Sequence, residues 1–289
     1  ICPPEWFDHY AERDLPLPPQ WRQSDWPAHP VIDHFRRFFD FHPPFEEPQI
    51  RRLLAAYYGA CSFLDEQIGR VLTQLESLGL AERTRVIYSS DHGEHLGGRG
   101  IFGKFSLYDE SAAIPMIAAG PDVPPGAVCR TPTSLVDLYP SIIESVGAAS
   151  HNDDAGLPGR SLWTIASNPD AQRTVLSEYH AVGSQHASYM LRDERYKYNY
   201  YVGAPAQLFD MVSDPEELND LAGSADHAEV VASFDLRLRQ ILDPELVDSQ
   251  ARADQAARVE ALGGEQAVRA RGSFDNSPAP GEAATFRNH

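Results

Sequence analysis

The chain has 289 residues, enough for one large domain or for one domain with a smaller second one. Hydrophobic residues make up 42% of it and charged residues 23%, as in an ordinary globular protein. The net charge of −18 repels the phosphates of nucleic acids and anionic membrane surfaces, so we expect neither as a partner. No apolar run approaches the roughly 20 residues needed to span a bilayer.

The three cysteines, Cys2, Cys61 and Cys129, fit neither a disulfide framework nor the spacing of a metal site. We expect reduced thiols. The sequence starts at Ile1 instead of a methionine and shows no signal peptide, so we expect the true N-terminus to lie upstream. A cytoplasmic and a periplasmic bacterial location both stay open.

The first half of the chain begins with a proline-rich stretch. Residues 1–48 hold ten of the 23 prolines, which predicts an extended, irregular segment because proline removes backbone donors. Residues 49–78 carry apolar side chains at spacings of three and four, which predicts a long helix. Gly79 follows as its expected C-terminal cap.

Strands and helices then alternate. The apolar run at 85–91 predicts a buried strand that ends at Asp91, and a glycine-rich loop follows from Gly93 to Gly103. A second core strand is predicted at 114–120 and a helix at 140–147. This alternation indicates an α/β domain.

The pattern changes in the last third of the chain. Four short runs separated by hairpin-length gaps predict a small antiparallel sheet over 174–180, 187–194, 196–202 and 207–211. Asp214 and Pro215 are typical of a helix start, and a further helix is predicted over about 226–242. Residues 248–271 favour a weak helix, and the last 18 or so are polar enough to predict disorder.

The chemistry-bearing residues lie between the two predicted core strands. Asp91 and His92 lie at the end of the first strand, and ligands of α/β sheets bind beyond the carboxyl ends of strands. A carboxylate beside an imidazole can coordinate a divalent cation. The glycines that follow allow close backbone approach to a ligand, and Lys104 offers a compact positive charge to an anion. Alone, these features are also compatible with an ordinary loop.

The order of the residues is more specific. The segments "SDHGEHLG", "GIFGK", "YDES" and "IPMIAAGP" resemble the second conserved block of the sulfatase family, in the alkaline phosphatase superfamily. Downstream, "SLVDLYPSIIESVG", "GLPGRSLW" and "LFDMVSDPEELNDLA" resemble later segments of that family in the same order. The resemblance covers roughly residues 1–222, and the Asp–His pair is similar to choline sulfatases and phosphonate monoester hydrolases.

The resemblance implies a fold and a site. The fold is α/β: part of an alkaline-phosphatase-like mixed sheet flanked by helices over 1–165, a small antiparallel-sheet subdomain over 166–245, and a polar tail over 246–289. Asp91 and His92 would be the second pair of metal ligands. Lys104 would be catalytic and bind the sulfate. Calcium is the usual metal of the family, and the imidazole favours manganese as the alternative.

The family's nucleophile is absent from the sequence. Sulfatases use a formylglycine made from the first residue of a C/S-x-P-x-R motif, and no cysteine or serine here begins one. We therefore expect the formylglycine outside this chain and no turnover by residues 1–289 alone. Two alternatives stay open: a phosphonate monoester or phosphodiester hydrolase on the same scaffold, and a truncated relic without catalysis. The expected partner is a small sulfate ester, and the oligomeric state stays open between a monomer and a homo-oligomer.

Several other side chains are candidates for contacts near the site. His95 and Arg99 lie in the same loop, where we expect solvated side chains. His180 ends a predicted strand together with Glu178 and is a weaker candidate for substrate binding.

Three tryptophans, Trp6, Trp21 and Trp26, suit either packing or a cation–π pocket for a quaternary ammonium group, and we expect packing. The segment "DPEELNDL" lacks the ligand spacing of an EF-hand, so we expect no calcium loop there.

Overall fold

A computed structural model of the protein describes residues 2–41, 44–149, 151–170, 172–274 and 286–287. The chain divides into two compact units, Ile1–Arg237 and Leu238–His289, and each is described by itself. Among the described residues, no helix is both long and apolar enough to cross a membrane. The division at residues 165 and 245 stays a prediction.

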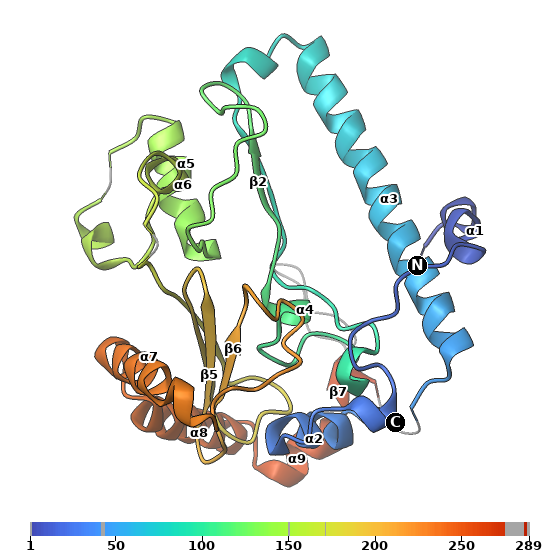
Figure 1. The fold of residues 1–289 in the computed structure, drawn as a ribbon, viewed down its shortest axis with the longest axis vertical. Helices are drawn as coiled ribbons and strands as arrows, with labels where there is room; N and C mark the ends of the chain where they lie inside the picture. The colour runs from blue at the N-terminus through green and yellow to red at the C-terminus, as the bar shows by residue number, and fades with distance from the viewer. Residues whose placement is uncertain (1, 42–43, 150, 171, 275–285, 288–289) are drawn as a thin grey trace. The chain divides into compact units, whose positions relative to one another are not determined.

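The two strands predicted on either side of the glycine-rich loop pair with each other. β1 (Val86–Ser89) runs antiparallel to β2 (Met116–Ala119), with Ser89 opposite Met116 (Figure 1). The prediction of buried strands is wrong for this chain by itself, because Tyr88 is 36% exposed and Ile117 is 59% exposed. In the described residues each strand pairs with the other alone, so both faces of the ladder are only partly covered.

The small antiparallel sheet is confirmed. Its strands follow one another in the order β3-β4-β5-β6, each joined to the next by a hairpin (Figure 1). The central strand β4 is buried along most of its length. The bounds are Val175–Tyr179, Ser188–Arg192, Tyr196–Tyr201 and Gln207–Asp210.

The long predicted helix is also present. α3 spans Glu47–Ser77 and begins with a capping box between Glu46 and Gln49. Gly79, with φ +65°, ends it in a Schellman arrangement, in which the N–H of Leu80 donates to the carbonyl of Leu75 at 3.1 Å. Large apolar side chains remain exposed along this helix: Tyr57, Phe63, Leu64, Val71 and Leu72.

The prediction of an irregular N-terminal segment is wrong in two places. α1 (Pro4–Ala11) and α2 (Pro30–Phe38) form there, each with a proline in its first turn, where a missing N–H costs nothing. α1 packs on α3 where Gly59 allows close approach, since a Cβ at that position would lie 2.8 Å from the Trp6 carbonyl oxygen.

The helix predicted from Asp214 does not form. The Asp214 carboxylate instead accepts hydrogen bonds from the N–H groups of Leu218 (3.1 Å) and Asn219 (2.7 Å), and Glu217 has φ +54°. These local bonds satisfy the backbone in a turn.

Short elements complete the first unit. The helix predicted at 140–147 is α5 (Leu138–Ser145), and α4 is Asp109–Ala112 and α6 is Leu162–Ser167. Short 3₁₀ turns lie at Gln23–Asp25, Ala81–Arg83, Gly98–Gly100, Leu135–Asp137, Asn152–Gly156 and Ala225–His227.

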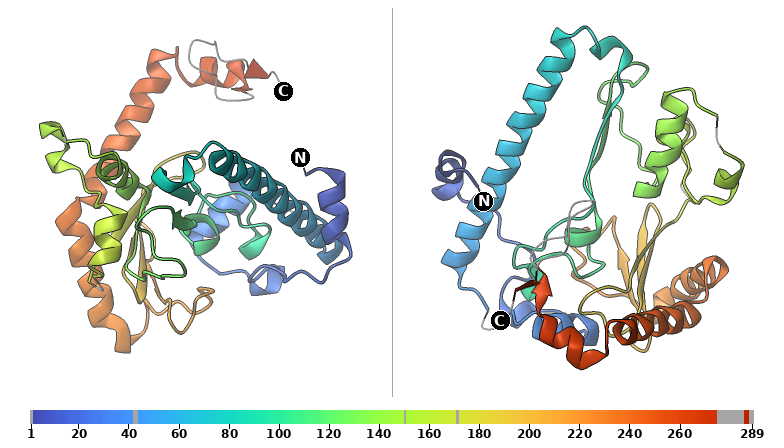
Figure 2. Two further views of the ribbon diagram at one scale, coloured as in Figure 1. Left: turned by 90° about the horizontal axis from the view of Figure 1, so that it is seen from above. Right: turned by 180° about the vertical axis from the view of Figure 1, so that it is seen from behind.

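A helix of the first unit runs into the second. α7 spans Ala228–Ile241, close to its predicted bounds. The predicted weak helix forms as α8 (Pro244–Ala261) and α9 (Glu265–Arg271), followed by the short strands β7 (Ser273–Phe274) and β8 (Phe286–Arg287) (Figure 2). The tail predicted to be disordered lies mostly outside the described residues.

Candidate active site

The loop between β1 and β2 brings three predicted site residues together. Nε2 of His92 lies 3.5 Å from Oδ2 of Asp91 and 2.6 Å from Nζ of Lys104. Asp91 and Lys104 are exposed, with 81% of the Asp91 side chain accessible. A carboxylate, an imidazole and an ammonium group therefore meet at one accessible place.

The hydrogen bonds of His92 fix the state of its ring. Nδ1 lies 2.8 Å from the carbonyl oxygen of Gly93, which can only accept, so Nδ1 carries a proton. In the neutral ring Nε2 then has a free lone pair. Lys104 can only donate, and it points its ammonium at that lone pair.

The pKa of Asp91 is shifted below its usual value. Desolvation, the largest single cause, raises this pKa, whereas backbone hydrogen bonds from Asp91 and His92 and the charge of Lys104 together outweigh it and lower the pKa. The carboxylate is ionised at neutral pH and can serve as an oxygen ligand.

The donor set of Asp91 and His92 fits part of a divalent cation site. An ionised carboxylate suits calcium. A metal-binding histidine usually donates one ring N–H to a carbonyl and binds the metal through the other nitrogen, as Nδ1 and Nε2 of His92 could do here. In the described part of the chain, no three His, Cys, Asp or Glu side chains cluster closely enough to complete such a site.

Asp91 also lines a hollow of about 350 Å³ between the β1–β2 loop and the small sheet. Its other lining residues include two arginines and several hydroxyl side chains: Arg130, Arg192, Thr131, Ser134 and Ser177. This polar hollow lies within the first unit.

The N-terminal segment supports the glycine-rich loop from outside. The N–H of Arg99 donates to the carbonyl of Pro19 at 3.2 Å, and the Arg36 guanidinium donates to the carbonyl of Arg99 at 2.7 Å. Gly100 lies against the Trp26 indole, where a Cβ would meet the ring at 2.3 Å. The residue at position 100 must therefore be glycine for this contact to form.

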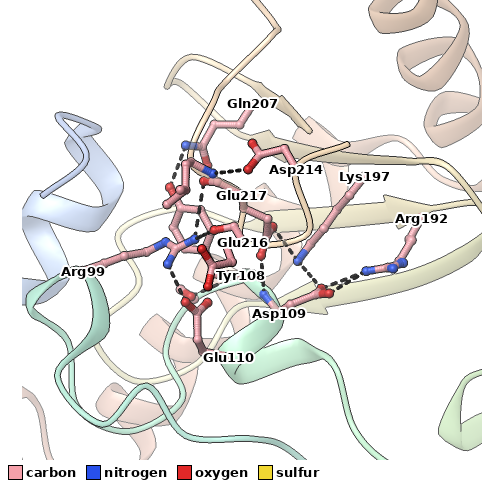
Figure 3. Close-up of polar contacts among 12 residues, drawn as sticks. Arg99, Tyr108, Asp109, Glu110, Arg192, Lys197, Gln207, Asp214, Glu216 and Glu217 are labelled. Carbon is pink, nitrogen blue, oxygen red and sulfur yellow. Dashed lines mark hydrogen bonds and ion pairs between the residues drawn. The ribbon is translucent and has the colours of Figure 1, made fainter. Parts of the chain in front are cut away.

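His95 and Arg99 are not solvated, contrary to expectation. His95 is 1% exposed and Nε2 of its ring lies 2.8 Å from the Ser106 hydroxyl. Burial lowers its pKa to about 3. Arg99 is fully buried, forms an ion pair with Glu110 and donates to the Glu216 carbonyl (Figure 3). Both side chains stabilise the loop through these buried contacts, His95 with Ser106 and Arg99 with Glu110 and Glu216.

A buried charge cluster joins the loop to the small sheet. Lys197 of β5 is fully buried, and its Nζ lies 2.7 Å from Asp109 and 2.8 Å from Glu217 (Figure 3). Arg192 of β4 also pairs with Asp109, at 2.7 Å. Burial raises the pKa of Glu217 above its usual value. Burial also raises the pKa of Asp109, but the charges and hydrogen bonds of Lys197 and Arg192 outweigh it and bring that pKa below its usual value.

His180 contacts two side chains of the small sheet. Its Nε2 lies 3.2 Å from Glu178, and its ring packs edge-on against Tyr189. Its neighbour Tyr179 packs on Phe35, and so does Phe105, which follows Lys104. The segments that carry His180 and Lys104 thus share one aromatic cluster.

Trp21 and Trp26 pack within the chain, as expected. Arg36 lies over the ring of Trp26 and Arg22 over that of Trp21, so the chain's own guanidinium groups occupy these faces. Glu94, Glu110 and Lys197 are not among the residues predicted for the site. Lys197 did carry a signal, since a lysine within an otherwise tyrosine-rich strand must find a counter-charge when that strand is central.

Comparison with known proteins identifies the family. The sequence profile of the sulfatase family matches residues 18–148, and that of the N-sulphoglucosamine sulphohydrolase C-terminal region matches residues 93–243. Arylsulfatase K of Xenopus laevis is 33% identical over 253 residues, which cover 84% of this chain and 46% of that protein. Choline-sulfatase of Rhizobium meliloti (strain 1021) is 34% identical over 216 residues, 73% of this chain and 42% of that protein.

Solved structures share the fold. The phosphonate monoester hydrolase of Silicibacter pomeroyi is 28% identical, with a TM-score of 0.67 over 80% of this chain and 51% of that one. A 2-O GAG sulfatase, at 23% identity, has a TM-score of 0.65 over 88% of this chain and 58% of that one. The chain spans less than half the length of the curated relatives quoted above. Its mixed α/β architecture and its ordered sequence blocks show that the chain belongs to the sulfatase family of the alkaline phosphatase superfamily.

Proposed function

We propose that this chain carries part of the metal and sulfate site of a sulfuric ester hydrolase. The observation behind the proposal is the meeting of Asp91, His92 and Lys104, with Oδ2 of the aspartate and Nζ of the lysine at 3.5 Å and 2.6 Å from Nε2 of the histidine. A tetrahedral oxyanion held by a cation needs such a set: a ligand pair on one side and a compact positive charge on the other.

Asp91 and His92 would hold the ion through a carboxylate oxygen and through Nε2. A divalent cation bound there would act as a Lewis acid on the oxygens of the ester. The carboxylate suits calcium, and the imidazole shifts the preference toward manganese. Two protein ligands leave most of the coordination sphere to water, to the substrate or to residues outside this chain.

Lys104 would bind the sulfuryl oxygens. An imidazole lone pair serves one partner at a time, so a cation on Nε2 of His92 would release the Lys104 ammonium from its hydrogen bond. The freed ammonium is a strong donor to an anionic oxygen, and it offsets the charge that develops in the transition state. Lys104 is thus the proposed catalytic residue of this chain.

The nucleophile would come from outside these residues. No C/S-x-P-x-R motif occurs in the sequence, and the sulfatase reaction needs a covalent step on formylglycine. We therefore propose that the 289 residues alone do not turn over sulfate esters. The hollow at Asp91 offers room for the alcohol of a small ester.

Two other functions compete with this one. Similarity to the Silicibacter pomeroyi enzyme favours a phosphonate monoester or phosphodiester hydrolase as the second candidate. Both ester classes present a tetrahedral anion, so the three site residues suit either. A relic without catalysis would keep the metal site but show no turnover in any longer form of the protein.

The test uses the longest natural form of the protein, assayed with an aryl sulfate and an aryl phosphonate ester in the presence of calcium or manganese. A sulfatase should show a higher kcat/KM for the sulfate ester. A clear preference for the phosphonate ester would assign the second function, and no turnover of either ester would indicate the relic.

A further inference from the structure

Glu94 joins the two ends of the glycine-rich loop. Its Oε1 accepts hydrogen bonds from the N–H of Gly103 at 2.6 Å and from that of Leu96 at 3.0 Å. The carbonyl of Gly103 in turn accepts from the N–H of His95 at 3.1 Å. Both peptide groups of Gly103 are therefore held by residues that closely follow His92 in the sequence.

The loop needs this support because its backbone is strained. Leu96 and Arg99 have φ of +51° and +56°, in the left-handed region that side chains other than glycine rarely adopt. Gly103 has φ +84°, and a Cβ there would meet the Phe105 ring at 2.7 Å. A charged acceptor forms stronger hydrogen bonds than a neutral one, so the Glu94 carboxylate is well suited to hold such a turn closed.

Lys104 depends on that turn for its position. Its side chain is exposed, and in the described part of the chain its ammonium has one hydrogen-bond partner, His92. A long flexible side chain with a single contact is placed chiefly by its own backbone. That backbone begins at the Gly103–Lys104 peptide, whose carbonyl is held by His95.

We propose that Glu94 is a positioning residue for Lys104: it closes the glycine-rich loop at Gly103 and so places the ammonium opposite His92. Its catalytic consequence rests on the proposed function, whereas its effect on the place of Lys104 does not. Glu94 would touch neither the metal nor the substrate.

The composition of the chain makes the position of Lys104 directly measurable. Lys104 and Lys197 are the two lysines of these 289 residues, so this chain labelled with ¹³C-lysine gives two side-chain spin systems, one exposed and one buried. The measurement is the nuclear Overhauser effect between the Lys104 ε-methylene and the His92 ring, together with hydrogen exchange of the Gly103 amide. Glu94→Ala should remove the first and accelerate the second at least tenfold, while the Lys197 signals stay in place.

Two further variants separate positioning from general damage. Glu94→Gln keeps a carbonyl oxygen at the same place and should restore the Overhauser effect. Glu66→Ala, on the exposed face of α3, is the matched control and should change nothing. If Glu94→Ala does not fold, Glu94→Asp replaces it, because its shorter side chain cannot reach both N–H groups. An Overhauser effect that persists in the folded Ala or Asp variant would overturn the proposal.

A binding measurement links the position to the function. Inorganic sulfate is titrated, with calcium present, into wild type, Glu94→Ala, Lys104→Ala and the double variant. If Glu94 acts through Lys104, Glu94→Ala should weaken sulfate binding about fivefold and have no further effect in the Lys104→Ala background. Equal losses in both backgrounds would overturn the positioning role. Sulfate binding that is absent, or unchanged in Lys104→Ala, would instead contradict the proposed function and leave the Overhauser test to decide on Glu94.

Discussion

The ammonium of Lys104 lies 2.6 Å from Nε2 of His92, the same nitrogen that would bind a divalent cation. The lysine and the cation therefore compete for one lone pair, and their positive charges repel each other. In the proposed enzyme, a bound ion and a free ammonium belong to the same state of the site.

This competition predicts opposite effects of Lys104→Ala on two measurements. Manganese binding should strengthen about five- to tenfold, since a hydrogen bond and a like charge worth roughly 1 kcal/mol are removed. The kcat/KM of the longer protein should fall by a factor that corresponds to a loss of transition-state stabilisation on the order of 2–4 kcal/mol, typical of a lost charged contact. Calorimetry and steady-state kinetics check the two parts. A large loss of melting temperature with no kinetic effect would show that Lys104 is structural.

His95 predicts a pH dependence of stability. Its pKa is lowered from 6.5 to about 3, chiefly by burial and further by the charges of Arg99 and Lys197. Between about pH 6.5 and pH 3 the imidazole is protonated in the unfolded state and neutral in the folded state. The contribution of neutral His95 to the free energy of unfolding is therefore complete above pH 6.5 and is lost as the pH falls toward 3. The slope is at most about 1.4 kcal/mol per pH unit.

Urea unfolding of wild type and His95→Gln between pH 7 and pH 4.5 measures this contribution. The wild-type free energy of unfolding should fall more steeply with decreasing pH than that of the variant, which has no imidazole to protonate. Parallel curves would mean that His95 is accessible to protons in the folded state.

Lys197 should be among the most sensitive positions for stability. Lys197→Met leaves Asp109 and Glu217 close together in a buried place with Arg192 as the nearby cation, so the free energy of unfolding should fall by about 3–5 kcal/mol. The matched control is Arg269→Met, which removes an exposed pair with Glu265 and should cost about 1 kcal/mol or less. Similar losses in both variants would contradict the central role of the cluster.

The sequence predicted the regular elements of the fold better than the burial of individual side chains. The long apolar period of α3 and the short alternating runs of β3–β6 are local signals, and both predictions are confirmed. Burial is not local. Arg99 lies in a glycine-rich stretch that is typical of a solvated loop, yet it is buried because Glu110 and the turn at Glu216 lie next to it only in the folded chain.

Three predictions about where helices form were wrong for a related reason. Pro4 and Pro30 belong to the stretch predicted to be irregular, although proline also suits the first turn of a helix, where both lie. Asp214 was interpreted as a helix cap, but its carboxylate binds two N–H groups of a turn. The residue type was informative in each case, and the choice between its two uses depended on tertiary contacts.

The second unit should be dispensable for chemistry. Every proposed site residue and the charge cluster of Lys197 lie within Ile1–Arg237. Truncation of the longer protein after residue 245 should therefore leave kcat/KM within about threefold, provided that the fold and oligomeric state are retained. Loss of turnover in a truncated protein that is folded and unchanged in assembly would show that the tail completes the site.

The most direct test of the proposed site is replacement of Asp91 by alanine in the longest natural form of the protein. Bound metal and turnover of an aryl sulfate are measured beside an Asp14→Ala control, which removes an exposed aspartate that pairs with Arg51. The proposed function predicts that Asp91→Ala loses both bound metal and turnover while Asp14→Ala keeps both. Unchanged metal content and activity in Asp91→Ala would contradict it.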